Sequence, residues 1–378
     1  MTRAGRFIKQ VEGYKAFIPA PLPPEPPLAF DPEMLRLLSE ADHGVGQLDG
    51  VASILPNPEF FVAMYVRHEA VLSSQIEGTQ STLEDILEYE IGAGGAEQPK
   101  DVEEVVNYVS AMNHGLARLD TLPLSLRLIR EIHEKLMTGT RGGEKSPGEF
   151  RRTQNWIGPS GANLRTARFV PPPVSDMEAA LDNLEKFLHD EELPILVQCA
   201  LVHAQFETIH PFLDGNGRVG RLLITFLLCH RQVLSKPLLY LSAYLKTNRI
   251  EYYDRLMAIR NNGDWEGWIK FFLRGVSEVS RAATGAAHSI VTLRETQRAN
   301  INKRFAAASI ANSMKLLDLL FDHPIVTVRI VEENLNCAFV TANKLVDEFV
   351  KHGILKETTG GQRNRVFRFA PYLDIFNS

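Results

Sequence analysis

The stretch His210-Pro-Phe-Leu-Asp-Gly-Asn-Gly-Arg-Val-Gly-Arg221 decides how this 378-residue chain is interpreted. Residues 214–217 predict a tight turn, because Asp, Gly and Asn tolerate turn and left-handed backbone geometry. The run that follows, 218–228, is mostly apolar and predicts a buried helix. A glycine-rich turn that leads into a helix directs free backbone N–H groups at one point. Such a point is an anion site, and phosphate is its usual ligand.

Charged side chains surround this predicted anion site. Arg218 and Arg221 are three residues apart, so they share a helix face, and two guanidinium groups there suit a polyphosphate. Asp214 is acidic where everything else favours anions, so we expect magnesium to bridge it and the phosphates. His210 can take a proton near neutral pH. Together these residues indicate a nucleotide, a metal ion and a general base.

Single fragments of this stretch have ordinary explanations. An isolated Gly-Asn-Gly is usually a turn, and a lone His before Pro is usually a cap or a surface residue. The whole string is much more specific than its parts. It is not a Walker A loop, since no Gly-Lys-Ser/Thr is present, and no Gly-x-Gly-x-x-Gly follows a strand.

Every fixed position of residues 210–221 matches the Fic motif, His-Pro-Phe-x-Asp-Gly-Asn-Gly-Arg-x-x-Arg. The chain therefore resembles Fic (filamentation induced by cAMP) proteins, which are mostly adenylyltransferases that move AMP from ATP to a Ser, Thr or Tyr hydroxyl of a protein. The resemblance implies that His210 deprotonates the target hydroxyl and that Asp214 holds magnesium. The further residues that it implies are the phosphate-cradling Gly215, Asn216 and Gly217 and the arginines of the outer phosphates, Arg218 and Arg221.

A second informative piece is Ser73-Ser-Gln-Ile-Glu-Gly78. Ser73 and Glu77 are four residues apart and share a face if the segment is helical, which by itself describes an ordinary solvated helix face. The piece also resembles the inhibitory helix of many Fic proteins, Ser/Thr-x-x-x-Glu-Gly/Asn, here represented by Ser73, Glu77 and Gly78. That resemblance implies that Glu77 pairs with Arg221 beside the nucleotide. An engaged Arg221 cannot hold the γ-phosphate, so ATP would bind unproductively.

Residues 139–173 are rich in Gly, Pro, Arg and Asn and predict a long loop, which in a compact domain is usually functional or disordered. Residues 153–157 and 168–170 predict a short hairpin whose edge accepts a target segment, or else an ordinary basic surface hairpin. Fic proteins have a flap here, and the resemblance implies that the following residues lie against the nucleotide: Asn155, Trp156, Ile157 and Gly158.

The adenosine contacts are expected in residues 249–264. By resemblance, Tyr252 lies near the adenosine, although an amphipathic core tyrosine is the plain alternative. Asn261 is expected to add an amide. His203, on the helix that leads into the motif, is expected to be structural rather than catalytic.

Helical patterns dominate the rest of the chain. A proline-rich arm at 17–27 precedes them. The expected helices cover residues 32–50 (with Gly44 and Gly46 near its end), 102–119, 125–137, 176–189, 194–208 and 276–305. Residues 92–95 are expected to form a flexible break.

The C-terminal region has a different pattern. Helices are expected at 314–321, 331–335 and 339–352, followed by two strands in 353–369 joined at Gly360-Gly361. This order resembles a winged helix-turn-helix, with 341–350 as recognition helix. The wing would carry Arg363, Arg365 and Arg368. The recognition helix mixes two lysines with Asp347 and Glu348, a poor footprint for DNA, so a protein-interaction role is preferred.

The composition is that of an ordinary globular protein, with 44% hydrophobic and 23% charged residues. A net charge of −5 gives no overall attraction to nucleic acid. Three widely spaced cysteines make neither a disulfide framework nor a metal cluster, which fits a reducing cytoplasm. The N-terminus lacks an apolar signal core, and the apolar run 222–229 is too short to span a bilayer, so no membrane association is expected.

These observations predict a mainly α protein: a Fic all-helical core with a short β-hairpin flap, plus a C-terminal winged helix-turn-helix. The expected divisions are an arm and inhibitory helix region (1–100), a catalytic core (101–290) and a winged-helix-like domain (291–378). The expected function is an autoinhibited protein adenylyltransferase that uses ATP and Mg²⁺ on a target protein or on itself, with a homodimer plausible from the family.

Two alternatives stay open at this point. One is a DNA-binding regulator whose Fic domain only senses nucleotide, against which the intact His210 argues, since a sensor needs no base. The other is a Fic enzyme with different chemistry, such as AMP removal or phosphorylation, which the fixed motif residues do not separate from AMP transfer.

Overall fold

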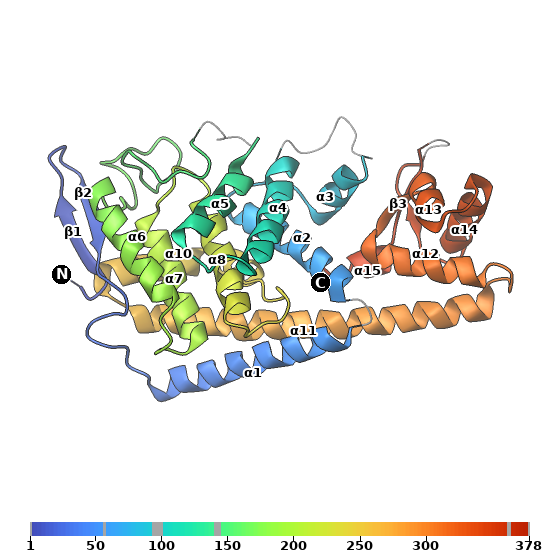
Figure 1. Ribbon diagram of the computed structural model, residues 1–378, viewed down its shortest axis with the longest axis horizontal. Helices are drawn as coiled ribbons and strands as arrows, with labels where there is room; N and C mark the ends of the chain where they lie inside the picture. Colours follow the sequence, from blue (N-terminus) through green and yellow to red (C-terminus); the bar gives the residue numbers. More distant parts are fainter. Residues whose placement is uncertain (1, 56–57, 93–100, 140–144, 361–363, 377–378) are drawn as a thin grey trace.

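The computed structural model describes residues 2–55, 58–92, 101–139, 145–360 and 364–376. The chain is mainly helical, as predicted. Helix α11 (Trp265–Arg304) runs along the molecule, and α1 (Pro32–Ile54) lies beside part of it (Figure 1). The helices that also pack on α11 are α7 (Ile195–Ile209), α9 (Ser242–Thr247), α10 (Arg249–Asn262), α12 (Ile310–Asp322) and α15 (Ala370–Leu373). Of the two helices that flank the motif, α7 packs on both α1 and α11.

Helix α1 begins at the cap residue Asp31, whose side chain accepts a hydrogen bond from the backbone N–H of Met34 at 2.8 Å. It runs through Gly44 and Gly46, which were expected near its end, and reaches Ile54. The helix approaches α11 closely at Gly44, where an added Cβ would lie 3.1 Å from the Cβ of Ser280. Gly44 therefore marks a close helix contact and not a helix end.

The central helices agree with the predicted segments to within a few residues, because their apolar residues recur at helical spacing. They are α4 (Val102–Leu119), α5 (Leu126–Met137), α6 (Val174–Leu188), α7 (Ile195–Ile209) and α8 (Asn216–His230). Helices α9 (Ser242–Thr247) and α10 (Arg249–Asn262) follow, and the sequence analysis did not predict them. Nearly every residue of α7 and α8 is buried, and the two helices pack on each other. The loop between them is the motif, so the core of the protein fixes both of its ends.

Two helices precede this core. Helix α2 (Pro58–Ile76) packs on α4 and α9 and carries Ser73 near its C-terminal end, and the predicted inhibitory residues Glu77 and Gly78 follow in a turn directly after it. Helix α3 (Leu83–Glu90) follows, with a capping box between Thr82 and Asp85. The predicted break at 92–95 lies outside the described residues except for Gly92.

A β-hairpin that the sequence analysis missed stands at the N-terminus. Strands β1 (Gly5–Lys9) and β2 (Lys15–Pro19) are antiparallel, with Phe7 opposite Phe17. The predicted proline-rich arm, 17–27, begins within strand β2 and continues beyond it. The backbone N–H of Phe17 donates to the carbonyl of Val170 at 3.0 Å, so the hairpin supports the long loop before α6.

The C-terminal elements follow the predicted order of helices and strands, with an additional short strand (β3) and an additional short helix (α15). They are α12 (Ile310–Asp322), β3 (Ile325–Thr327), α13 (Val328–Leu335), α14 (Phe339–Lys351), β4 (Lys356–Glu357), β5 (Val366–Arg368) and α15 (Ala370–Leu373). The strands form an antiparallel sheet in the order β3-β5-β4. The predicted division at 290/291 falls within α11, which runs unbroken across it, and that division stays a prediction.

The C-terminal elements pack against the segment that carries the predicted inhibitory residues. Helix α12 contacts α2, and β3 contacts α3. The guanidinium of Arg368 lies 3.0 Å from the Glu84 carboxylate, and the ring of Phe376 lies 5.3 Å from that of Tyr65 on α2. The first half of α2 is therefore held by the C-terminal end of the chain.

Candidate active site

The motif loop between α7 and α8 is held in a fixed conformation by its own side chains. His210 ends α7 in left-handed geometry (φ 49°, ψ 60°), and Gly215, also left-handed (φ 74°), precedes α8. The amide of Asn216 bridges back across the turn, accepting from the N–H of Phe212 and donating to its carbonyl, both at 2.8 Å. The side chain of Asn216 thus fixes the loop, and its expected contact with phosphate stays a prediction.

Two residues of the preceding loop also hold the motif. The guanidinium of Arg151 donates to the carbonyl of His210 at 3.0 Å, and Arg151 N–H donates to the carbonyl of Pro211 at 2.8 Å. The amide of Asn155 donates to the carbonyls of Phe212 at 2.9 Å and His210 at 3.3 Å. Sequence reasoning missed Arg151, whose only signal is that it is one of two adjacent arginines ahead of the flap segment.

His210 is partly buried at the edge of a pocket. Burial foremost, and the charges of Arg260 and Arg151, lower the pKa of the imidazole to about 3. The ring is therefore neutral at physiological pH, which is the form that accepts a proton. Its Nδ1 lies 3.9 Å from a carboxylate oxygen of Glu207, one helical turn earlier.

Arg221 is buried and held by α2. Its Nε donates to the hydroxyl of Ser73 at 2.7 Å, and its Nη2 donates to the Ser73 carbonyl at 3.0 Å and to the Glu77 carboxylate at 2.7 Å. Burial alone would lower the pKa of Arg221, but the Glu77 carboxylate outweighs it and raises that pKa above its ordinary value. The structure thus brings together the residues predicted to form the inhibitory contact.

The Glu77 carboxylate also lies against the first turn of α8. A Cβ added at Gly217 would collide with Glu77 Oε1 and would approach Arg221 Nη1 to 3.0 Å. Gly78 follows with a φ of +106°, which a glycine adopts readily. An anionic side chain therefore occupies the helix N-terminus at which a phosphate was expected.

A pocket of about 430 Å³ lies beside the ion pair of Glu77 and Arg221. It is enclosed by the start of α8, the end of α7, the loop before α6 and helix α10. The lining residues are Glu77, Ile157, Gly158, Pro159, Arg168, Phe169, Glu207, His210, Gly217, Arg221, Arg249, Tyr252, Tyr253, Leu256, Met257 and Arg260. One part of this lining is cationic and includes a helix N-terminus, and another part is aromatic and aliphatic, which suits a nucleotide.

Several residues predicted to contact the nucleotide lie outside the pocket. Asn155 points to the motif loop, whereas Trp156 is 43% exposed, because successive side chains of an extended segment face opposite ways. Asn261 is exposed, because it lies nine residues after Tyr252, and nine steps of about 100° reach the opposite face of α10. Of the predicted flap contacts, Ile157 and Gly158 line the pocket.

A hydrogen bond joins His203 to Tyr252, one of the residues that line the pocket. The ring nitrogens of His203 lie 2.9 Å from the Gly220 carbonyl and 2.9 Å from the Tyr252 hydroxyl. Both nitrogens are therefore engaged in the core, which agrees with the structural role expected of His203. The buried Tyr252 lines the pocket, and its hydroxyl is held by this bond.

The two motif arginines face different partners. Arg218 is buried, lies 3.5 Å from the Glu104 carboxylate and 4.0 Å from that of Asp214, and does not line the pocket. Residues three apart on a helix are separated by about 60° around its axis, which lets neighbouring arginines diverge. The expectation that both side chains share one site is therefore not met in this structure.

Asp214 is the residue predicted to hold a metal. Its carboxylate is partly exposed, accepting from the backbone N–H of Gly215 at 2.7 Å and from the ammonium of Lys145 at 2.8 Å. Burial raises the pKa of this carboxyl, but the bonds to Lys145 and Gly215 outweigh it and lower the pKa below its ordinary value. Among the described residues, no group of three His, Cys, Asp or Glu side chains is arranged to hold a metal.

The flap contains less strand pairing than predicted. Within 145–173, the pairing is one antiparallel bridge between Ile157 and Phe169, with N–H···O distances of 2.8 and 3.0 Å. The intervening loop closes on itself, with Asn163 accepting hydrogen bonds from the N–H groups of Arg165 and Thr166, and this local closure ends the pairing. The expected β-hairpin is therefore reduced to a bridge beside the pocket.

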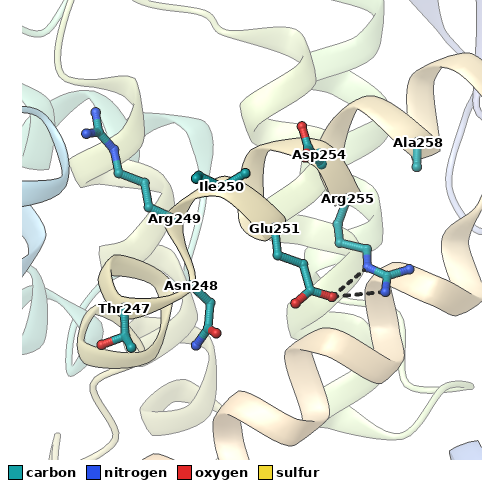
Figure 2. A pocket seen from close by; sticks show the side chains of 8 residues that line it. All are labelled: Thr247, Asn248, Arg249, Ile250, Glu251, Asp254, Arg255 and Ala258. Atoms are coloured by element: carbon teal, nitrogen blue, oxygen red, sulfur yellow. Dashed lines mark hydrogen bonds and ion pairs between the residues drawn. The ribbon is translucent and has the colours of Figure 1, made fainter.

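A larger hollow, of about 740 Å³, lies on the outer side of α9 and α10 (Figure 2). Its carboxylate Glu251 accepts two hydrogen bonds from Arg255, at 2.9 and 3.1 Å. It contains none of the predicted site residues, so the chemistry points to the smaller pocket.

In the described part of the chain, no helix is both long and apolar enough to cross a membrane.

Comparisons with known proteins bear on the family of the chain. Residues 35–117 match the family model described as Fic/DOC family N-terminal, and residues 123–228 match that of the Fic/DOC family. A protein adenylyltransferase Fic of Drosophila grimshawi is 30% identical over 206 residues, which cover 52% of this chain and 38% of that protein. The protein of the same description in Drosophila willistoni is 28% identical over 258 residues, or 61% and 47% of the two chains. The chain spans less than half the length of these relatives.

Solved structures show the same fold. A Fic family protein from Desulfovibrio desulfuricans G20 superposes with a TM-score of 0.60 at 18% identity, covering 91% of this chain and 97% of that chain. A Fic domain containing signaling protein from Bacteroides thetaiotaomicron VPI-5482 gives a TM-score of 0.51 at 19% identity, covering 68% and 97%. From its motif, its helical core and both family matches, the chain belongs to the Fic/DOC family.

Proposed function

We propose that this chain transfers AMP from ATP to a hydroxyl group of a protein, and that its own helix α2 restrains the reaction. The observation that carries the proposal is the neutral His210 imidazole at a pocket that also contains Arg221 and the N-terminus of α8. A base, an anion site and an apolar wall are the parts that this transfer needs. The names of the relatives, protein adenylyltransferase Fic, support the same reaction class.

In this reaction His210 takes the proton of the target Ser, Thr or Tyr hydroxyl. The hydroxyl oxygen forms a bond to the α-phosphorus of ATP while the bond to the bridging oxygen of the β-phosphate breaks. Pyrophosphate leaves with that oxygen, and AMP stays on the target. Arg151 and Asn155 contribute by holding the carbonyl of His210, which keeps the ring in place.

The phosphates would lie at the start of α8. The backbone N–H groups of its first turn and the Arg221 guanidinium supply the positive end of the pocket. Asp214 fits magnesium, because this ion commonly binds one or two carboxylates together with substrate phosphates. When bound, magnesium would neutralise charge on the departing pyrophosphate. Lys145, which now pairs with Asp214, would compete for the same oxygen.

Helix α2 would restrain transfer by two effects of one side chain. Glu77 engages Arg221, which then cannot hold the outer phosphate. The Glu77 carboxylate also places negative charge beside Gly217 at the anion site, where a phosphate would be repelled. While α2 stays in this position, ATP is expected to bind in an arrangement that does not react.

For the C-terminal elements we infer a role in protein contacts rather than in DNA binding. Of the predicted wing arginines, Arg363 lies outside the described residues. Arg365 pairs with Asp347 at 3.1 Å and Glu357 at 2.9 Å, and Arg368 pairs with Glu84. Guanidinium groups that are already neutralised contribute little to binding phosphates of DNA.

The test is incubation with magnesium and ATP labelled at the α-phosphate. The parent protein, Glu77→Gly and Glu77→Gly/His210→Ala would be compared, alone and with a cell extract as source of targets. Label on protein with Glu77→Gly that vanishes in the double variant supports AMP transfer. Label that appears only from ATP labelled at the γ-phosphate would contradict it and indicate phosphorylation.

A further inference from the structure

The pocket contains a buried carboxyl group that the reaction above does not use. Glu207 lies in the last turn of α7, three residues before His210, and is 7% exposed. Its Oε2 lies 3.9 Å from His210 Nδ1, too far for a hydrogen bond, and its Oε1 has no hydrogen-bond partner in the described part of the chain. Buried polar atoms are nearly always partnered, so this oxygen indicates a ligand group that completes the site.

The neighbouring cations direct their hydrogen bonds elsewhere. Arg221 donates to Ser73 and Glu77. Arg260 donates to the Thr208 hydroxyl at 3.1 Å and to the backbone carbonyl of Glu207 at 3.1 Å, and not to its carboxylate. The Glu207 carboxyl is therefore left free to accept from whatever occupies the pocket.

The position of Glu207 in the pocket selects the part of a nucleotide that it meets. A Cβ added at Gly220 would lie 3.0 Å from Glu207 Oε1, so the carboxyl group packs against α8 one turn beyond its start. The anion-binding groups lie at that start, and the aromatic wall, Tyr252 and Tyr253, lies on α10. In a nucleotide, the sugar joins the phosphates to the base, and its hydroxyl groups are the hydrogen-bond donors between them.

The charge of Glu207 favours a hydroxyl over a phosphate. Burial raises the pKa of this carboxyl to about 7, while Arg221 and Arg260 counteract the rise, so a large share is ionised at neutral pH. A carboxylate accepts hydrogen bonds and repels phosphate oxygens. A sugar hydroxyl satisfies the unpartnered oxygen without this repulsion, in the way that acidic residues of other nucleotide sites bind a ribose hydroxyl.

We propose that Glu207 accepts a hydrogen bond from a ribose hydroxyl of the nucleotide and makes the pocket selective for ribonucleotides over deoxyribonucleotides. The inference rests on the proposed function, since it requires that this pocket takes ATP. In this proposal Glu207 recognises the sugar, which is a role separate from the proton transfer at His210.

The test is a set of dissociation constants for ATP, 2′-deoxy-ATP and 3′-deoxy-ATP, measured by calorimetry with magnesium. The protein is the Glu77→Gly/His210→Ala variant, which frees Arg221 and prevents turnover. We expect ATP to bind roughly tenfold or more tightly than at least one of the deoxy analogues, the usual effect of one hydrogen bond to a charged group. Adding Glu207→Ala should bring that ratio close to one, and Glu207→Gln, which keeps an acceptor oxygen, should preserve part of it.

Glu251→Gln is the matched control, since this carboxylate lies on the outer side of α10 and already pairs with Arg255. It should leave the ratio unchanged. The inference is overturned if the Glu77→Gly/His210→Ala protein binds all three nucleotides equally tightly. It is also overturned if both Glu207 variants lose the same affinity for all three nucleotides. Either result would leave nucleotide binding itself intact. If Glu77→Gly/His210→Ala binds none of the three, the proposed function fails and the inference fails with it.

Discussion

The guanidinium of Arg221 donates a 2.7 Å hydrogen bond to the carboxylate of Glu77, a residue 144 positions away in the sequence. The same carboxylate lies against Gly217 at the start of α8. One side chain therefore neutralises a motif arginine and occupies the helix N-terminus beside it. An arginine that is engaged and a site that is already anionic both oppose the productive binding of a triphosphate.

Replacing Glu77 by glycine should release this restraint. The rate of AMP transfer is expected to rise by about 5- to 150-fold, the usual range of coupling between an inhibitory contact and a site. Label transfer from α-labelled ATP measures it. Glu59→Gly, at the opposite end of α2, is the matched control, and equal rates in the two variants would show that Glu77 does not restrain the enzyme.

Ser73→Ala should activate the enzyme less than Glu77→Gly does. The change removes the hydroxyl that accepts from Arg221 Nε at 2.7 Å but leaves the Glu77 pair in place. We expect a rise of roughly tenfold, because one hydrogen bond to a charged group is lost while the Glu77 pair stays. Ser74→Ala is the control, since the buried Ser74 hydroxyl has no hydrogen-bond partner in the described structure. Activation by both changes alike would point to a loosened helix instead.

The rate of AMP transfer should not fall as the pH drops through about 6.5, where a histidine base with an ordinary pKa would become protonated. The pKa of His210 is lowered to about 3, so its ring stays neutral as the pH falls through 6.5. In Glu77→Gly protein at saturating ATP, kcat is expected to show no acid limb centred near a pH of about 6.5. A profile that halves near that pH would mean that His210 carries an ordinary pKa in the complex.

Asn155→Ala should slow transfer without weakening nucleotide binding. The amide lies outside the pocket, and its bonds to the carbonyls of Phe212 and His210 hold the loop that positions the base. We expect kcat to fall roughly tenfold, because small displacements of a catalytic group are costly, with the dissociation constant for ATP unchanged. Gln154→Ala is the control, since its amide bonds to Pro171 and Asn155 and not to the motif. A weaker affinity for ATP in Asn155→Ala would place this amide at the nucleotide after all.

His203 should make the folded protein less stable as the pH falls. Burial lowers its pKa to about 4, so below pH 6.5 the unfolded chain binds a proton that the folded chain does not. Its contribution to the free energy of unfolding should fall by about 2 kcal/mol between about pH 7.5 and about pH 5. Glu69 and Glu207, whose pKa values burial raises to about 7, act in the opposite direction.

The histidine effect is therefore measured by difference. Urea unfolding of the parent and of His203→Gln at both pH values isolates it, and the variant should lose less stability on acidification. The same comparison with His288→Gln, an exposed residue of α11, serves as control. A variant that loses as much as the parent would show that His203 is not the residue that takes up the proton.

The sequence by itself determined the parts that depend on neighbours along the chain. Apolar residues at helical spacing located the core helices, and the Asp-Gly-Asn-Gly turn located the start of α8. The motif also identified the family, and it predicts His210 as the general base. These features could be predicted because helix and turn geometry is set by residues a few positions apart.

Only the tertiary structure decided which side chains meet. Sequence spacing placed Arg218 beside Arg221, whereas packing turned Arg218 toward Glu104. Asn155 was placed at the nucleotide by position, yet its hydrogen bonds run to the motif loop. Glu207 had no recognisable signal, because a lone glutamate in an apolar helix becomes informative only when the fold buries it beside His210. Such contacts join residues from separate elements, and close packing of the whole core, rather than local propensity, fixes the direction of each side chain.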